Sequence, residues 1–353
     1  MPNRRELLMS MGGALMTSTL GGRGPLRAAS RSPASGVGVC IYSYHLRFRS
    51  DRSFFEPMNV LEYCHGIGAG GIQASIGTKD EKYTSTLRAK AEEYGMFVEG
   101  IAGLPVDDGD VERFEAEVVT AKEAGAGVVR VVVTPGAGRR FEEFDTCAGF
   151  NEAWKTGRER LERGARVAER HRVRLAVENH KDARIDGMLE ALRSVGSEFV
   201  GMCLDMGNSL SLLEDPMDVI EAYAPYTFSV HLKDVAVRED EDGFLMAQVP
   251  LGDGMIDLSR TVKTIAAHRP EAKYSLEIMT RDPIRVPCLT EKYLASMCEV
   301  PANDLARTLR MVRAWGRKEP LPQISTLEQS EQLRLEDENV KKSLAYAGEH
   351  LGL

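Results

Sequence analysis

The sequence predicts an α/β fold, a single (β/α)8 TIM barrel, from two observations. Short apolar runs alternate with helix-length segments between residues 37 and 315, as in strand–helix units around a buried parallel sheet. Four successive runs lead into a side chain that commonly binds metals, namely Glu178, Asp205, His231 and Glu277. Because the carboxyl ends of barrel strands meet on the catalytic face, these four side chains are expected to point at one place.

Continuous apolar runs give the expected strands, because strands covered on both faces need no polar alternation. The first four are residues 37–44, 71–76, 96–102 and 128–133. The last four, which lead into the metal-binding side chains, are residues 174–178, 200–205, 228–231 and 274–277. Eight such runs in one chain match the strand number of a closed barrel.

Helix signals separate these runs. Helices are expected at residues 59–68, 84–94, 110–124, 150–172, 185–194, 216–223 and 258–268, and again at 302–315 and 327–348. Gly95 and Gly125 follow the second and third of them, where glycine readily ends a helix. The helix at 150–172 carries Glu and Arg three or four positions apart, which is typical of a solvated outer face. The two tryptophans, both expected to pack, are Trp154 and Trp315.

One connection is longer than the others. Glu178, Asp205 and His231 are 27 and 26 residues apart, whereas His231 and Glu277 are 46 apart. The excess lies at residues 235–256, where a charged turn separates two short β-type runs, 235–237 and 244–249. Because this insertion leaves from the catalytic end of a strand, we expect it to form a lid or a wall of the pocket.

The chain divides into three regions. Residues 1–35 begin with paired arginines, Arg4 and Arg5, followed by an apolar run, and resemble a twin-arginine export signal. This predicts an exported, periplasmic protein; the alternative is a disordered basic tail on a cytoplasmic one. Residues 36–318 are the expected barrel. Residues 319–353 are expected to be a helical extension that lies along the barrel or mediates assembly into a homo-oligomer.

The composition argues against two classes of partner. The 353 residues carry a net charge of -8 with a pI near 5.6, which disfavours nucleic acid as a partner. After residue 35 no uninterrupted apolar run approaches the ~18 residues of a membrane span. The six cysteines show no C-x-x-C or zinc-ribbon spacing. Cys40 and Cys203 are expected to be buried apolar residues, and no disulfide is expected, with Cys288 and Cys298 the candidate pair in an exported protein.

The four strand-end side chains predict one divalent metal ion. Three carboxylates and one imidazole suit Mn²⁺, Mg²⁺ or Co²⁺, with Zn²⁺ a poorer match. Burying three carboxylates together is costly through repulsion and desolvation unless a cation accompanies them. The alternative for any one of them is a buried polar group satisfied by an ion pair.

The motifs around these residues carry a resemblance. They are Val-Glu-Asn-His at 177–180, Leu-Asp-Met-Gly-Asn at 204–208, His-Leu-Lys-Asp at 231–234, Gly-Asp-Gly-Met-Ile-Asp at 252–257 and Ser-Leu-Glu at 275–277. The set resembles the sugar phosphate isomerase/epimerase family, whose fold is the xylose isomerase-like barrel. The resemblance implies that Glu178, Asp205, His231 and Glu277 hold one metal ion. It also implies that the two glutamates are catalytic, taking and returning a proton on a carbohydrate substrate through a metal-stabilised enediolate.

Two departures from the ketose 3-epimerases of that family favour an alternative reaction. Those enzymes have a histidine three positions after the aspartate, where this chain has Asn208, and an arginine six positions after the metal histidine, where it has Val237. The alternative is a metal-dependent lyase or dehydratase acting on a keto-sugar, keto-glycoside or inositol derivative. A histidine-rich zinc hydrolase acting on abasic DNA and a metal-free sugar-binding barrel are two further hypotheses, and the acidic composition argues against the first.

Four further side chains are candidates for binding substrate. They are His180, Asn208, Lys233 and Arg281. Each also has a purely structural interpretation: a supporting hydrogen bond for His180, an ion pair with Asp234 or Asp205 for Lys233, and an ion pair with Asp282 for Arg281. Arg281, if unpaired, suits a carboxylate or phosphate. His45 follows the first strand and is expected on the surface rather than in the pocket.

Overall fold

Eight parallel strands close into a barrel in the computed structural model, which describes residues 35–134 and 139–353. Around the barrel the order is β1-β10-β7-β6-β5-β4-β3-β2, so strands that follow one another in the barrel units lie side by side. The strands are β1 (Gly38–Cys40), β2 (Gly71–Ala74), β3 (Phe97–Ile101), β4 (Val128–Val131), β5 (Arg174–Glu178), β6 (Val200–Asp205), β7 (Thr227–Leu232) and β10 (Lys273–Leu276). The predicted (β/α)8 barrel is confirmed.

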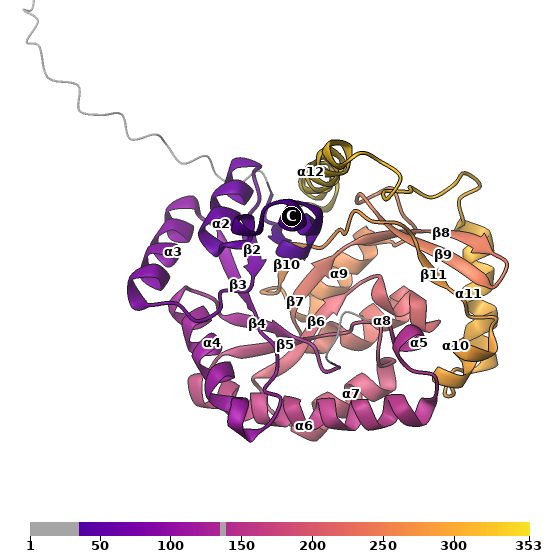
Figure 1. Ribbon diagram of the computed structural model, residues 1–353, viewed down its shortest axis with the longest axis horizontal. Helices are drawn as coiled ribbons and strands as arrows, with labels where there is room; N and C mark the ends of the chain where they lie inside the picture. Colours follow the sequence, from indigo (N-terminus) through magenta and orange to yellow (C-terminus); the bar gives the residue numbers. More distant parts are fainter. Residues whose placement is uncertain (1–34, 135–138) are drawn as a thin grey trace, which may run out of the picture. The chain divides into compact units, whose positions relative to one another are not determined.

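Helices lie outside the ring of strands (Figure 1). They are α1 (His45–Ser50), α2 (Pro57–Gly66), α3 (Glu81–Tyr94), α4 (Val111–Glu123), α5 (Arg140–Glu143), α6 (Cys147–His171), α7 (Ile185–Val195), α8 (Pro216–Tyr223), α9 (Leu258–His268), α10 (Glu291–Ser296), α11 (Ala302–Trp315) and α12 (Gln329–Tyr346). Local chemistry sets their ends. Asp80, Thr146 and Asp257 accept a hydrogen bond from a backbone N–H of the first turns of α3, α6 and α9.

The first barrel strand is shorter than predicted. Residues 37–44 were expected to be extended, but β1 ends at Cys40 and a 3-10 helix follows at Ile41–Tyr44. The Ser43 hydroxyl donates to the Leu276 carbonyl (3.1 Å) and accepts from the Ile278 N–H (3.1 Å). These bonds hold the turned chain against the carboxyl end of β10, and apolar composition alone does not distinguish a buried turn from a buried strand.

The predicted insertion forms a separate antiparallel sheet. Strands β8 (Asp234–Asp240) and β9 (Gly243–Val249) make a hairpin. Strand β11 (Ile284–Val286) pairs with β9 on the side away from β8. Figure 1 shows this sheet to one side of the barrel, next to α11. The Asp234 carboxylate accepts from four backbone amides, those of Val235, Gly252, Gly254 and Ile256. A side chain at position 254 would collide with that carboxylate, so the close approach requires glycine.

The C-terminal segment packs on the barrel. Helix α12 contacts α1 and β10, and Glu336 accepts from the backbone amides of Leu46 (2.7 Å) and Arg47 (3.0 Å). Ser35 donates to the carbonyl of Leu353 (3.2 Å), so the last residue lies beside the start of β1. Residues 319–353 therefore lie along the outside of the barrel as one compact unit with it.

The expectations about the disulfide and about Trp315 are wrong. Cys147 and Cys298 form a disulfide, whereas none was expected, and Cys288 is a buried free thiol rather than a partner of Cys298. Cys147 and Cys298 are 151 residues apart and meet only because α6 begins beside the segment after α10. Trp154 is buried as predicted, but Trp315, at the end of α11, is 66% exposed.

The proposed export signal lies outside the described residues, apart from Ser35. Among the helices described for residues 35–134 and 139–353, none is long and apolar enough to cross a membrane.

Candidate metal centre and substrate cavity

Four side chains from neighbouring strands converge at the carboxyl end of the barrel. Glu178 ends β5, Asp205 ends β6, His231 lies in β7 and Glu277 directly follows β10. The strand register explains the convergence, because Asp205 pairs with His231 and the Glu277 N–H donates to the Leu232 carbonyl (3.0 Å). One potential ligand atom from each of the four lies within 4.8 Å of the others.

The imidazole of His231 stands at the centre of the group. Its Nδ1 lies 3.7 Å from Glu178 Oε1, 3.6 Å from Asp205 Oδ2 and 3.5 Å from Glu277 Oε2. All four side chains are buried. Within the described residues, His231 Nδ1 has no hydrogen-bond partner, and a buried polar atom left this way points to a ligand; Asp205 Oδ2 has only the ammonium of Lys233 beside it (2.6 Å).

A buried network fixes the orientation of His231. Its Nε2 lies 2.7 Å from Gln73 Oε1, while Gln73 Nε2 donates to Glu99 (2.9 Å). Ser229 also donates to Glu99 (2.7 Å). Because the amide nitrogen of Gln73 donates to Glu99, its oxygen accepts from His231 Nε2–H, and Nδ1 is the ring nitrogen that faces the three carboxylates. An imidazole held this way is arranged as a metal ligand.

Backbone amides orient Asp205. Its Oδ1 accepts from the N–H groups of Gly207 (3.0 Å) and Asn208 (2.9 Å), so Oδ2 is the oxygen that faces His231. Asn179 ties the ends of β5 and β6 together, accepting from the Asp205 N–H (2.7 Å) and donating to the Asp205 carbonyl (2.8 Å). The motif Leu-Asp-Met-Gly-Asn thus presents one carboxylate oxygen to the centre.

Two buried cations lie among the carboxylates. Arg130, in β4, donates through Nε to Glu178 Oε2 (2.6 Å) and also through its terminal nitrogen. The Nζ of Lys233 lies 2.6 Å from Asp205 Oδ2 and 2.5 Å from Glu277 Oε2. Burial alone would raise the pKa of Glu178, but Arg130 and His231 hold it well below its usual value. Burial opposes the charge on Lys233, yet Asp205 and Glu277 raise its pKa.

The charge balance and donor set fit a divalent ion. Three carboxylates against two cations leave one negative charge. Burial opposes a charge on His231, yet the acidic groups around it raise its pKa well above the usual value, so either a proton on the imidazole or a metal ion can balance the centre. Ligands of one ion lie roughly 3–4.4 Å apart when each bond is about 2.1–2.2 Å, which covers the separations measured from His231. The four residues therefore fit a single divalent metal, although Arg130 and Lys233 already neutralise much of the charge.

A cavity of about 500 Å³ opens beside this centre. Glu277, Lys233, His180 and Arg281 line it, as does Arg130. Glu178 and Asp205 lie deeper and are not among its lining residues. The inserted hairpin contributes Gln248, whose side-chain oxygen accepts from the Met279 N–H (2.5 Å), so the insertion forms part of the cavity wall.

The substrate-binding candidates fall into two groups. His180, Lys233 and Arg281 border the cavity, and burial, followed by the charge of Lys181, lowers the pKa of His180 to about 4. Asn208 is 1% exposed and does not border it; its amide donates to Glu178 Oε1 (3.2 Å) and its oxygen accepts from Lys181 (2.5 Å).

The expected structural roles hold in part. Lys233 forms an ion pair with Asp205, which was one of the two partners expected for a structural role, and also with Glu277. Arg281 forms no ion pair with Asp282. The Asp282 carboxylate instead accepts hydrogen bonds from Ile324 and Ser325. His45 is half-buried beside Glu336 rather than on the surface, and it lines a different cavity.

Sequence reasoning missed four residues that shape the site. They are Gln73, Arg130, Lys181 and Gln248. Gln73 and Arg130 each interrupt an apolar strand run with a large polar side chain, and that signal was available in the sequence. Lys181 and Gln248 carried no such signal, since each lies in a polar or mixed segment.

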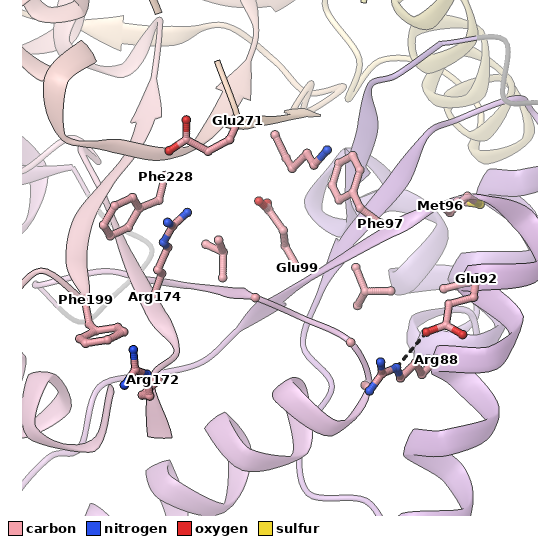
Figure 2. Close-up of a pocket in the computed structure, with 17 residues that line it drawn as sticks. Arg88, Glu92, Met96, Phe97, Glu99, Arg172, Arg174, Phe199, Phe228 and Glu271 are labelled. Carbon is pink, nitrogen blue, oxygen red and sulfur yellow. Dashed lines mark hydrogen bonds and ion pairs between the residues drawn. The ribbon is translucent and has the colours of Figure 1, made fainter. Parts of the chain in front are cut away.

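A second cavity, of about 630 Å³, lies at the opposite mouth of the barrel (Figure 2). Its lining includes the first residues of β3, β4, β5 and β10, with Arg174 close to Phe228, and the buried Glu99 is among its lining residues. None of the four converging side chains lines it. It is therefore separate from the candidate metal centre.

Comparison with known proteins agrees with this geometry. The family model described as a xylose isomerase-like TIM barrel matches residues 61–309. The chain belongs to this family. The predicted resemblance is thereby confirmed, and members of the family include sugar isomerases and epimerases.

Individual members of the family are distant relatives of the chain. It is 31% identical over 99 residues to a 3-oxo-isoapionate decarboxylase from Pectobacterium atrosepticum, which is 28% of this chain and only 36% of that protein. A D-tagatose 3-epimerase-like protein superimposes with a TM-score of 0.52 at 14% identity, covering 86% of this chain and 99% of its own. A xylose isomerase-like barrel protein from Mycobacterium smegmatis, in complex with magnesium, gives 0.51 at 14% identity, covering 73% and 88%. At such identities the structures establish the fold alone.

Proposed function

We propose that the chain is a divalent-metal-dependent isomerase or epimerase that acts on a sugar or keto-sugar. The observation that carries this proposal is the convergence of Glu178, Asp205, His231 and Glu277 beside a cavity at the catalytic end of the barrel. Family membership supports it, because structural neighbours include a D-tagatose 3-epimerase-like protein and a magnesium complex.

These four residues would hold the metal ion. Their oxygen-rich set suits Mn²⁺, Mg²⁺ or Co²⁺ better than Zn²⁺. A divalent ion bound there supplies positive charge that polarises a substrate carbonyl and makes the neighbouring proton easier to remove. Gln73 keeps the free nitrogen of His231 turned toward the other three residues.

The two glutamates have unequal access to substrate. Glu277 borders the cavity and is the residue placed to take a proton from the carbon next to a carbonyl. Lys233 donates to Glu277 Oε2 (2.5 Å) and so fixes the direction of that carboxylate. Glu178 is 1% exposed, and an epimerase role requires it to return the proton on the opposite face.

Hydrogen exchange with solvent tests the proposal. Purified protein is first analysed for bound metal, then loaded with Mn²⁺ and incubated with a panel of keto-sugars in D₂O, with deuterium incorporation followed by NMR. We expect exchange next to the carbonyl of one substrate, and Glu277→Gln to reduce its rate by roughly 10²–10⁴-fold. Glu338→Gln, an exposed surface change, serves as the control. Exchange at the wild-type rate in Glu277→Gln would remove that residue from the catalytic role.

A specific contact favours a second candidate, a metal-dependent lyase. Arg130 binds Glu178 Oε2 and keeps that carboxylate ionised, which makes Glu178 a poor proton donor. A lyase needs only one base beside the carbonyl, because a leaving group departs instead of a second proton arriving. Loss of water or of an alcohol with a new C=C absorbance identifies the lyase, whereas deuterium in an intact sugar identifies the isomerase or epimerase.

We also propose that the protein is exported to the periplasm through Arg4 and Arg5. The Cys147–Cys298 disulfide supports this, because disulfides persist in oxidising compartments. Replacing both arginines by lysine should leave the full-length chain in the cytoplasm, as cell fractionation and blotting would show. Unchanged periplasmic recovery of that variant would contradict the proposal.

A further inference from the structure

The cavity beside the candidate metal centre contains two cations that lack an anionic partner among the residues that the structure describes. Lys181, directly before Asp182 and 4% exposed, has only the neutral oxygen of Asn208 on its Nζ (2.5 Å). Arg281, which follows the β10 loop, makes no hydrogen bond or ion pair with any described residue. Both line the same cavity as Glu277.

The other cations of this cavity are all paired. Arg130 binds Glu178, and Lys233 lies between Asp205 and Glu277. Two further lining cations are also paired, Arg113 with Asp110 and Glu117, and Arg139 with Glu142. Within residues 35–134 and 139–353, no carboxylate lies within 4.0 Å of the Lys181 or Arg281 side-chain nitrogens. The four residues between these ranges, Pro-Gly-Ala-Gly, contain no acid.

Holding two unpaired cations in a shielded cavity is unfavourable. Burial, followed by the charge of Lys233, lowers the pKa of Lys181 to about 7, and burial together with Arg139 lowers the pKa of Arg281. Lys181 also experiences the charge of Arg281, so the two cations raise the positive potential in one region. An anion placed there relieves this cost.

We propose that Lys181 and Arg281 bind a carboxylate group on the substrate, so that the enzyme acts on a sugar acid rather than on a neutral sugar. The inference rests on the proposed function, since it places this carboxylate in the cavity where Glu277 moves a proton. A guanidinium presents two parallel N–H groups that match the two oxygens of a carboxylate, and a neighbouring ammonium adds a third donor.

Binding measurements that need no turnover test the inference. The Mn²⁺-loaded enzyme is titrated by calorimetry with D-gluconate and with D-sorbitol, which share a carbon chain and differ in a carboxylate against a hydroxymethyl group. We expect gluconate to bind about tenfold or more tightly than sorbitol, as expected for one charge-assisted contact. D-Sorbitol 6-phosphate is titrated in the same way, to test whether the two cations prefer a phosphate group to a carboxylate.

Variants then locate the contact. Arg281→Gln should remove most of the preference for gluconate while leaving sorbitol binding unchanged, and the fold should tolerate it because Arg281 bonds to no described residue. Arg281→Lys should retain part of the preference. The matched control is Arg113→Gln, which removes a cation that is already paired with Asp110 and Glu117 in the wall of the same cavity. Because every variant keeps the metal residues, binding of gluconate by the metal itself cancels in the comparison.

Three results would overturn the inference. The first is equal binding of gluconate and sorbitol, and the second is a preference for gluconate that survives in Arg281→Gln. The third is tighter binding of the sorbitol phosphate with the same dependence on Arg281, which would make the group a phosphate. Failure of the proposed function is a different result, namely no deuterium exchange with any keto-sugar, and it leaves the calorimetric comparison intact.

Discussion

At the scale of single residues, Arg130 and Lys233 change the electrostatic argument for a metal ion. Three buried carboxylates were expected to require a doubly charged ion, but the two side chains already supply two positive charges. A bound ion would therefore contribute to the remaining charge and to the proposed chemistry more than to folding. This makes the stability of the metal-free protein a measurable question.

We expect the protein to stay folded when its metal is removed. After treatment with a chelator, the far-UV circular dichroism should be unchanged and the melting temperature should fall by several degrees, since a ligand that binds only the folded state stabilises it by mass action. Adding Mn²⁺ should restore the melting temperature. Complete unfolding on chelation would show that Arg130 and Lys233 do not balance the site.

Replacing Arg130 should be costly because it leaves Glu178 buried without its partner. In the metal-free protein, Arg130→Met is expected to lower the free energy of unfolding by about 3–5 kcal/mol, measured by urea denaturation. The double variant Arg130→Met with Glu178→Gln should recover much of that loss, because the stranded charge is gone. Equal losses in the single and double variants would indicate that packing of the Arg130 side chain dominates instead.

The convergence of the four candidate metal-binding residues was predictable from sequence, and their supporting residues were not. Glu178, Asp205, His231 and Glu277 each end or follow an apolar run, and parallel strands in register bring their ends together. Which cation faces which carboxylate depends on whether each side chain points into or out of the barrel, and the sequence alone does not give this direction. Lys233, for example, points into the centre and pairs with Asp205 rather than with Asp234.

At the scale of elements, α12 is held by a buried acid whose ionisation is disfavoured. Glu336 accepts two backbone amides of α1, and burial raises its pKa from 4.5 to about 7 despite those bonds. His45 lies 3.4 Å away, with its own pKa lowered to about 4 by burial, and Arg47 and Asp337 are the charged neighbours. The attachment of α12 should therefore depend on pH.

The sign of this dependence follows from proton binding. Between pH 4.5 and about 7 the folded state holds a proton on Glu336 that the unfolded state has released, so this contribution to stability is complete below pH 4.5 and is lost as pH rises through 7. From pH 5 to 8, wild-type protein should lose roughly 1–3 kcal/mol relative to Glu336→Gln in chemical denaturation. Glu338→Gln, exposed on the same helix, should show no such difference from wild type. A constant gap between wild type and Glu336→Gln would contradict the assignment.

At the scale of the whole molecule, the disulfide links parts of the chain that are remote in sequence. Replacing Cys147 and Cys298 by serine should lower the free energy of unfolding by about 2–5 kcal/mol, as measured by urea denaturation under oxidising conditions. The same change in reducing buffer should have little effect. Thiol titration of the unfolded oxidised protein should find four groups, Cys40, Cys64, Cys203 and Cys288, and six would show that the pair does not form.

The barrel was predictable because its strand and helix signals are local, whereas contacts between distant segments were not. The apolar runs predicted all eight barrel strands, and the largest error is the turn after Cys40; the strands at 71–76 and 128–133 end two residues earlier than predicted. The short strand β11 escaped prediction because prolines flank its three residues. The Cys147–Cys298 pairing and the exposure of Trp315 depend on how outer helices pack, and no local pattern records that.

The hairpin of β8 and β9 leaves the barrel and returns to it at one point, because Asp234 bonds to the backbone of Ile256 (3.1 Å). Exchange or lengthening of the loop tip between them need not displace His231 on one side or Glu277 on the other. Since Gln248 of this hairpin faces the cavity, changes in the hairpin can alter which ligands the cavity accepts while the four converging side chains stay in place. Grafting the corresponding hairpin from a relative is thus a route to new substrate preference.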